Sequence, residues 1–310
     1  MSIARIRPRI VYHYCSLDTF YSIFCNSTIR LSNISKSNDS EEITYLLPEM
    51  KQFCSELFGK YNDAFSEKYR LNENFVSDYF DSKFNELSLN FYVACFSEEA
   101  DLLSQWRGYA NDARGVSIGF LTEALYPLAS STSSNYNFSQ VRYSLDDLYE
   151  QVESYIVKNV RKDFTGDSRA DSLFLINIVD TTLSTIFYNS MLYKNPHFIE
   201  EKEWRLVYNP LGNIRRVMDK NSYYDRLTEV FSASTEKGGF ARMPMKFHIS
   251  DNKIVSHIDL SFSSIKNSFV KEIIIGPKSN IDVLDLELFL LSNGFNPMNI
   301  DIRKSDIPYR

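Results

Sequence analysis

The sequence predicts an α+β fold, in which a mixed, mostly antiparallel sheet is accompanied by helical insertions. Two observations lead to this fold class. Short runs rich in β-branched and aromatic residues recur along the chain, for example Ile10–Tyr14 and Phe91–Phe96, and such runs are typical of strands. Two long stretches, at about 41–87 and 145–192, instead repeat apolar residues at spacings of three and four, which is typical of helices. We therefore expect one domain, residues 1–310, with helical insertions at those two places.

The composition is that of an ordinary globular chain. Of its 310 residues, 44% are hydrophobic and 24% charged, which is enough for one large or two modest domains. The aromatic content of 15% favours a core with aromatic-lined clefts. A net charge of -6 argues against sequence-independent binding to duplex nucleic acid. Because no apolar run is long enough for a membrane span or a signal sequence, we expect a cytoplasmic protein.

The four cysteines predict buried thiols. Cys15, Cys25, Cys54 and Cys95 show no Cys-x-x-Cys pairing and stand in apolar surroundings. Zinc sites and disulfide frameworks need cysteines in pairs or clusters. The pattern therefore indicates a reducing compartment, and we expect no metal.

The first structured segment is predicted to begin with a strand. In Ile10–Tyr14, alternation places Tyr12 and Tyr14 on one face and His13 on the other. A lone histidine in a strand is more often structural than functional. Ser16 can cap a following short helix, and a second strand at 28–31 leads into a polar loop.

The stretch 90–120 is predicted to form strand, aromatic helix and strand. Ser97 can cap the helix, and the acidic residues at 98, 99 and 101 suit its positive first turn. Trp106 and Tyr109 then fall on one helical face. Such a scaffold could hold a flat ligand, and plain core packing is the alternative meaning of the two aromatic residues.

A predicted strand at about 201–208 carries two carboxylates. Alternation places Glu201, Glu203 and Arg205 on the face opposite three large apolar residues. Two carboxylates on one strand face repel each other. We therefore expect one of them either to be held by a cation or to take part in proton or cation chemistry. Arg205 could also be a purely structural partner, and the residues leave both interpretations open.

The C-terminal part is predicted to complete the sheet. Residues 241–249 and 272–275 are expected strands, and the second is apolar enough to be a central strand covered on both faces. Residues 281–291 are an expected amphipathic helix, with Leu284, Leu288 and Leu291 on one face.

Several motifs together resemble the bacterial family called domain of unknown function 2971. They are, in order, the segment YHYCSLDTFYSIFCNSTIRLSN, the loop SND, the segment CFSEEADLLSQWRGYANDARGVSIGF and the segment EEKEWRLVY. The order and the residue types match over most of residues 10–280. The family name implies no activity.

A second resemblance does imply one. A histidine in the first strand, a short helix, a second strand, an aromatic-bearing helix and a late strand that opens on glutamate resemble the ADP-ribosyltransferase fold. The run from Glu203 to Tyr208 is similar to the segment in which that superfamily carries its catalytic glutamate. The pair Glu201 and Glu203 resembles the Glu-x-Glu element of its arginine-modifying branch. The chain departs from the pattern at Tyr14-Cys15, where many members have Gly-Ser or Gly-Thr, and it has no clear Ser-Thr-Ser strand.

The resemblance implies that NAD is the substrate and assigns a set of roles. Glu203 would stabilise the positive charge that develops on the ribose, and Glu201 would orient or deprotonate the acceptor. The other implied NAD contacts are His13 to the ribose, Tyr109 or Trp106 to nicotinamide, Ser32, Asn33 and Ser97 to the amide or ribose, and Arg30 and Arg107 to the diphosphate. The acceptor, whether protein, nucleic acid, small molecule or water, stays open.

These roles predict a geometry. We expect Trp106 and Tyr109 to line the principal cleft together with Glu203. We expect His13 to face the same cleft, because it lies opposite the two neighbouring tyrosines of its strand.

The NAD-consuming enzyme is expected to be a bacterial toxin or anti-phage defence effector. Two other functions fit the same residues. A non-enzymatic module, such as a sensor or partner-binding component of a bacterial defence system, would instead hold a ligand without converting it. A metal-dependent nuclease or hydrolase would use Asp39, Glu41, Glu201 and Glu203, although no His, Asp or Glu cluster has ligand spacing. Nicotinamide release from NAD separates the enzyme from the binding module, and inactivation by a chelator marks the hydrolase.

Overall fold

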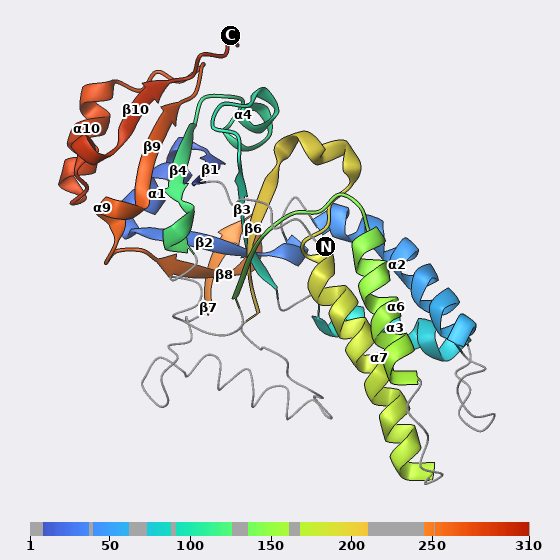
Figure 1. Ribbon diagram of the computed structural model, residues 1–310. Coiled ribbons are helices and arrows are strands. Elements are labelled where there is room, and N and C mark those ends of the chain that lie inside the picture. Colours follow the sequence, from blue (N-terminus) through green and yellow to red (C-terminus); the bar gives the residue numbers. More distant parts are fainter. Residues whose placement is uncertain are drawn as a thin grey trace, which may run out of the picture. The chain divides into compact units, whose positions relative to one another are not determined.

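The computed structural model divides the chain into two compact units, each described here by itself (Figure 1). The sheet unit lies within residues 1–33, 92–140 and 199–310, and the helical unit within residues 34–91 and 141–198. The structure describes residues 9–36, 40–61, 73–87, 91–125, 136–160, 168–209, 245–250 and 252–309. Helices and a mostly antiparallel sheet together confirm the α+β fold class.

The described strands of the sheet unit form one sheet. Their order is β10-β9-β4-β1-β3-β2-β8-β7, and β6 pairs with both β3 and β5. Only β9 and β10 run parallel among the pairs of this sheet. The strands are β1 (Ile10–Cys15), β2 (Thr28–Asn33), β3 (Tyr92–Ser97), β4 (Val116–Leu121), β5 (Tyr136–Gln140), β6 (Glu203–Tyr208), β7 (Met245–Ser250), β8 (Lys253–Ser261), β9 (Val270–Ile275) and β10 (Asp301–Lys304).

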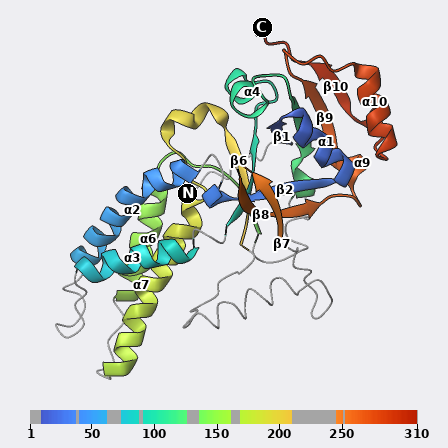
Figure 2. The same ribbon diagram turned by 180° about the vertical axis from the view of Figure 1, so that it is seen from behind.

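Side-chain alternation gives this sheet two faces. The face that carries Val11, Phe96 and Leu206, here called the first face, forms the larger hydrophobic core. The helices that contribute to this core are α1 (Leu17–Asn26), α9 (Lys266–Phe269) and α10 (Val283–Ser292). α1 and α10 lie side by side, since Tyr21 and Phe289 stack with ring centroids 5.3 Å apart (Figure 2). The first face is therefore closed by helices.

The second face of the sheet carries Tyr12, Tyr14 and Ile274 in a smaller apolar cluster. Helix α4 (Leu103–Tyr109) covers this cluster and packs Trp106 edge-on against Tyr14, with ring centroids 4.9 Å apart. Polar side chains dominate the rest of the second face, and the candidate site is described from them below.

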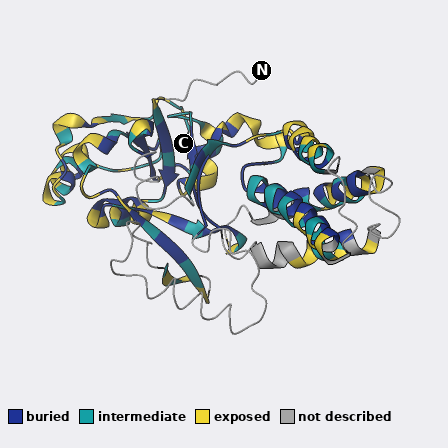
Figure 3. Cartoon of the chain, turned by 60° about the horizontal axis from the view of Figure 1, so that its bottom comes forward, coloured by how far each residue is buried: buried dark blue, intermediate teal, exposed yellow. Residues whose placement is uncertain are grey.

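The helical unit has a hydrophobic core of its own. Its helices are η1 (Ile34–Lys36), α2 (Ser40–Tyr61), α3 (Glu73–Leu87), α6 (Asp146–Val160) and α7 (Ser168–Ser190), and η5 (Pro196–Glu201) follows. Buried residues recur at helical spacing, as Leu46, Met50, Cys54 and Leu57 do along α2, and together they form the core. Figure 3 shows buried residues along the sides of these helices and along the strands. The four long helices lie in the two regions predicted as helical.

Several predicted elements are confirmed. Ser16 caps α1, because its Oγ accepts a hydrogen bond from the Thr19 N–H at 3.3 Å. The isoleucine run 273–275 is fully buried in β9, between β4 and β10. The hydrophobic pattern was sufficient at these places because local propensity and burial agree there.

Other expectations are wrong. The aromatic helix does not begin after Ser97 but at Leu103, and no side chain caps it. Glu201 does not belong to the late strand, since it ends η5 and β6 begins at Glu203. Cys25 is exposed on α1, whereas Cys15 and Cys54 are buried as expected. The strands β8 and β10 were not predicted at all.

Candidate functional site

The sheet splits beside β3. One edge of β3 pairs with β6 over its whole length. The other edge is shared, because β1 pairs with it at Ser97 and β2 pairs with it at Tyr92 and Val93. On that edge the registered pairs of β3 lie at its two ends, with the intervening residues 94–96 between them. Backbone polar groups at such a split must find other partners.

The His13 side chain contacts the backbone of β3 at Cys95. Its Nδ1 lies 3.0 Å from the Cys95 carbonyl oxygen, and a carbonyl only accepts, so Nδ1 carries the proton. The ring lies on the first face, tilted against Phe96 with centroids 5.9 Å apart. Burial lowers the pKa of His13 below its ordinary value, and the bond to Cys95 opposes this shift in part. His13 is thus a neutral imidazole that links β1 to the backbone of β3.

Glu203 and Arg205 form a buried ion pair on the second face. Arg205 donates from Nε to Oε1 at 2.6 Å and from an Nη atom to Oε2 at 3.2 Å. The Arg205 side chain is fully buried and that of Glu203 almost fully. Two charge-assisted bonds fix the carboxylate in place and keep both charges compensated. The predicted pairing with Arg205 is therefore present.

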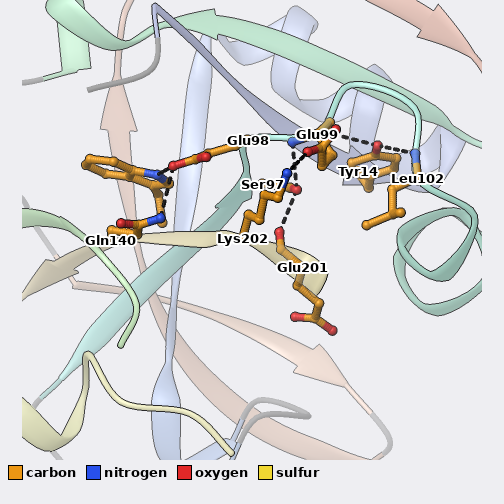
Figure 4. A network of polar contacts seen from close by, with 9 residues as sticks. Tyr14, Ser97, Glu98, Glu99, Leu102, Gln140, Glu201 and Lys202 are labelled. Carbon is orange, nitrogen blue, oxygen red and sulfur yellow. Dashed lines mark hydrogen bonds and ion pairs between the residues drawn. The ribbon is translucent and has the colours of Figure 1, made fainter. Parts of the chain in front are cut away.

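Ser97 connects this strand end to the turn that precedes β6. Its Oγ accepts from the Glu99 N–H at 3.0 Å and donates to the Glu201 carbonyl at 2.7 Å (Figure 4). Glu99 also pairs with Lys202, and its carbonyl accepts from the Tyr14 hydroxyl at 2.7 Å. These bonds use Ser97 as a structural link, which explains why it does not cap the aromatic helix.

Glu98 points to the other side of β3. Its Oε1 accepts from the Trp204 Nε1–H at 2.7 Å and from the Gln140 side chain at 3.1 Å (Figure 4). Trp204 and Phe96 belong to the core of the first face. The chain therefore holds two oriented glutamates near the end of β3, Glu98 on the first face and Glu203 on the second.

Trp106 is core and does not line a cleft. It is fully buried, and its indole N–H donates to Asp101 Oδ1 at 2.6 Å. No ring face is left for a ligand, so the expectation of an aromatic cleft is wrong for this residue. Tyr109, at the end of α4, is exposed. Of the two predicted stacking residues, Tyr109 alone has a side chain that a ligand can reach.

His13 and Glu203 do not face the same side of the sheet. Tyr12 lies opposite Ser97, and Ser97 lies opposite Glu203, so all three share the second face. His13 is on the first face, as its contact with Phe96 shows. The alternation within β1 was predicted correctly, but the register between strands decides which faces coincide, and that register was not predictable.

The remaining predicted contact residues are placed as follows. Ser32 lies opposite Val93 and therefore shares the second face with Glu203. Arg30, two residues earlier on β2, shares that face and lies 3.7 Å from Asp259. Asn33 is buried on the first face, and Arg107 is exposed on α4. The register thus collects Arg30, Ser32, Ser97 and Glu203 on one face.

A pair of histidines on this face was missed by the sequence analysis. His257 on β8 lies opposite Ser32, and its Nδ1 is 3.1 Å from Nδ1 of His248 on β7. Its Nε2 is 3.7 Å from Asp259, which also accepts from Lys246 at 3.1 Å. Burial, followed by the charge of Arg30, lowers the pKa of His257. The alternation in KIVSHIDLS is the signal that could have placed this histidine on a strand.

The two histidines with lowered pKa values predict a loss of stability in mild acid. The unfolded chain takes up protons as the pH falls through about 6.5, whereas folded His13 and His257 take them up at lower pH. The contribution of these two histidines to the free energy of unfolding is therefore largest above about pH 6.5. The free energy of unfolding declines as the pH falls below that value. We expect a lower thermal midpoint at pH 5.5 than at pH 7.5.

This prediction has a matched control. His13→Gln keeps a donor for the Cys95 carbonyl but has no imidazole to titrate. It should therefore reduce the difference between the thermal midpoints at pH 5.5 and pH 7.5. His197→Gln, at an exposed position, should leave it as in the wild type. Equal wild-type midpoints at both pH values would contradict the prediction.

A strained turn follows α4. Asn111, Asp112 and Ala113 all have left-handed backbone, with φ of 49°, 52° and 67°. Residues with a Cβ adopt this region at a cost, so surrounding contacts must hold it. The Ala113 N–H donates to the Trp106 carbonyl at 2.9 Å, and the Lys278 N–H donates to the Ala113 carbonyl at 3.0 Å. Such strain concentrates at functional sites, and this turn follows directly on Tyr109.

Lys278, which follows β9, and the C-terminal residues 305–309 secure the same turn. Lys278 donates to Asp112 Oδ2 at 2.8 Å, and the Tyr309 hydroxyl donates to Oδ1 at 2.7 Å. These bonds lower the pKa of Asp112 to about 2. The Ser305 hydroxyl donates to Asp101, which also holds Trp106. The C-terminal residues therefore fix the segments on both sides of α4.

The hydrolase alternative gains no support from the described residues. No three His, Cys, Asp or Glu side chains among them come together as metal ligands. Of the four acidic residues proposed for it, Asp39 and the side chain of Glu41 lie outside the described part. Within the same part of the chain, no helix combines the length and apolar character that crossing a bilayer requires.

Comparison with known proteins adds one finding. Residues 105–206, roughly a third of the chain, match the model of a family described as Protein of unknown function (DUF2971). The matched stretch includes Trp106, the strained turn, Glu203 and Arg205. No curated protein and no solved structure matches the chain.

Proposed function

We propose that the chain binds NAD as a substrate on the second face of the sheet and breaks its bond between nicotinamide and ribose. The ADP-ribosyl group then passes to an acceptor, as in an ADP-ribosyltransferase, or to water, as in an NAD glycohydrolase. The observation that carries this proposal is the register of the sheet, which collects Arg30, Ser32, Ser97 and Glu203 on one face.

Glu203 is the proposed catalytic carboxylate. When the bond breaks, its electron pair goes to the nicotinamide nitrogen and positive charge develops on the ribose. A fixed carboxylate stabilises that charge more in the transition state than in the ground state. The two hydrogen bonds from Arg205 fix Glu203, and its burial strengthens its electrostatic effect.

The other residues of this face suit the rest of the substrate. Arg30 is a partly exposed cation, which suits the diphosphate of NAD. The Ser32 hydroxyl suits the ribose or the amide, and Tyr109 suits nicotinamide. Glu201, next to the start of β6, is the proposed group that orients the acceptor. The histidines described on this face are His248 and His257, so His13 has a structural role in the proposal.

Nicotinamide release tests the proposal. Purified wild-type protein incubated with NAD should release nicotinamide, detected by chromatography. Glu203→Gln keeps the shape of the side chain and removes its charge, so turnover should fall by roughly 10²–10³-fold. Glu98→Gln is the matched control, because it removes an oriented carboxylate from the other face of the same sheet, and it should retain turnover.

Two results of this experiment would contradict parts of the proposal. A wild-type protein that releases no nicotinamide contradicts the enzyme. Loss of turnover in Glu98→Gln but not in Glu203→Gln contradicts the second-face site. The thermal midpoint of each variant is measured on the same preparation, so that unfolding is not mistaken for loss of catalysis.

A non-catalytic binding module is the second candidate, and the Glu203–Arg205 pair favours it. An arginine that compensates the carboxylate weakens the field available to a developing cation. In that case the second face would hold a ligand, and the chain could serve as a sensor within a toxin or defence system. NAD binding by calorimetry without nicotinamide release would identify this candidate.

A further inference from the structure

An apolar stripe on α10 remains exposed. Leu284, Leu288 and Leu291 are 62%, 54% and 55% exposed, while Leu286 and Leu290 are buried in the core of the first face. The sequence predicts this stripe as the apolar face of an amphipathic helix. The helix in fact has two apolar faces, and only one of them packs on its own unit.

The stripe has the spacing of a coiled-coil seam. The steps of four and three residues between Leu284, Leu288 and Leu291 correspond to the heptad positions d, a and d. In this register Asp285 occupies position e and Glu287 occupies position g. These two positions flank a seam on its two sides and select the partner by charge. α10 thus presents a leucine seam bordered on both sides by carboxylates.

The neighbouring helix α1 packs against α10 on the side of Phe289, which lies away from the leucine stripe. α1 exposes Leu17 and Tyr21, one turn apart, and Tyr21 stacks on Phe289 of α10. Neither Leu17–Asn26 nor Val283–Ser292 contains a lysine or arginine. The surface is therefore apolar with acidic borders, and exposed apolar patches of this kind mark interaction sites.

We propose that the α10 seam docks a helix of a partner protein with apolar a and d positions and lysine or arginine at e and g. Charge complementarity selects this occupant. A second copy of the chain would bring Asp285 and Glu287 against the same two acidic residues, which disfavours self-pairing. The seam has only three core positions, so the contact is a weak and transient one.

A pair of synthetic peptides tests the proposal. The probe is a 21-residue helix-forming peptide with leucine at a and d and lysine at e and g, labelled for fluorescence anisotropy. The control peptide differs only in having glutamate at e and g. The lysine peptide should bind the full chain at micromolar concentration and more tightly at low salt. The glutamate peptide should bind at least roughly tenfold more weakly.

Variants of the chain separate this seam from general attraction to an acidic protein. Leu288→Gln should weaken the binding of the lysine peptide by about tenfold, because one seam position is lost. Ile199→Gln changes an equally exposed apolar position away from α10, and it should not weaken the binding of the lysine peptide. The double variant Asp285→Lys and Glu287→Lys should reverse the preference and bind the glutamate peptide more tightly.

Three results would overturn the docking proposal. Equal binding of the lysine peptide by the wild type and by Leu288→Gln would overturn the seam. So would an unchanged peptide preference in the double lysine variant. Sedimentation could instead show that the wild type forms a concentration-dependent dimer and that Leu288→Gln is a monomer. That result would assign the surface to a second copy of the chain and overturn the proposal.

Discussion

Replacement of Arg205 by methionine should lower the free energy of unfolding by about 3–5 kcal/mol. The change removes the two bonds that Arg205 donates to the buried Glu203 carboxylate, and the loss of one partner of a buried ion pair is among the costliest defects in a folded protein. Methionine keeps a similar volume, so the loss reports the charge rather than a cavity. Urea-induced unfolding followed by circular dichroism measures it.

The double variant gives the control for this result. Glu203→Gln in the Arg205→Met background removes the buried negative charge, so it should recover a large part of the lost stability. Non-additivity of this kind is expected for residues in direct contact. If the two single losses simply add, the ion pair is not the source of the effect.

Replacement of Gly115 by alanine should destabilise the protein by roughly 3 kcal/mol. A Cβ at this position would lie 2.0 Å from the Cys15 carbonyl oxygen, which is backbone and cannot rotate away. The end of β1 and the start of β4 would have to separate, and the strained turn before Gly115 would lose its support. The thermal midpoint and urea unfolding both measure this loss.

Gly108 provides the matched control. A Cβ at this helical glycine would meet no atom within 4 Å. Gly108→Ala should therefore raise stability by up to about 1 kcal/mol, because alanine favours the helix. Equal effects of the two substitutions would show that the close approach at Gly115 does not determine stability.

The sequence was sufficient where a local pattern and burial coincide. The tyrosines of β1, the cap at Ser16 and the isoleucine run of β9 each satisfy both local propensity and the final environment. These elements were predictable because side-chain alternation and capping are local properties of the chain. The α+β class followed from them.

The candidate site was less predictable because it depends on pairing between distant strands. His257 and Ser32 are neighbours only through the pairing of β2 with β8. His13 and Glu203 fall on opposite faces because β1 meets β3 at Ser97, and a shift of one residue would have reversed this result. Trp106 had the spacing of either a core residue or a ligand platform, and only the bond to Asp101 decides for the core.

The interleaved order of the two units has a consequence for synthesis on the ribosome. Both segments of the helical unit are complete once residue 198 has been added. β2 ends at Asn33 but pairs with β8, which ends at Ser261. At about 5–20 residues per second, the nascent β2 edge waits roughly 10–50 s for its partner. The helical unit therefore has time to fold while one edge of β2 still waits for its partner, and an open strand edge exposes the growing chain to aggregation during this interval.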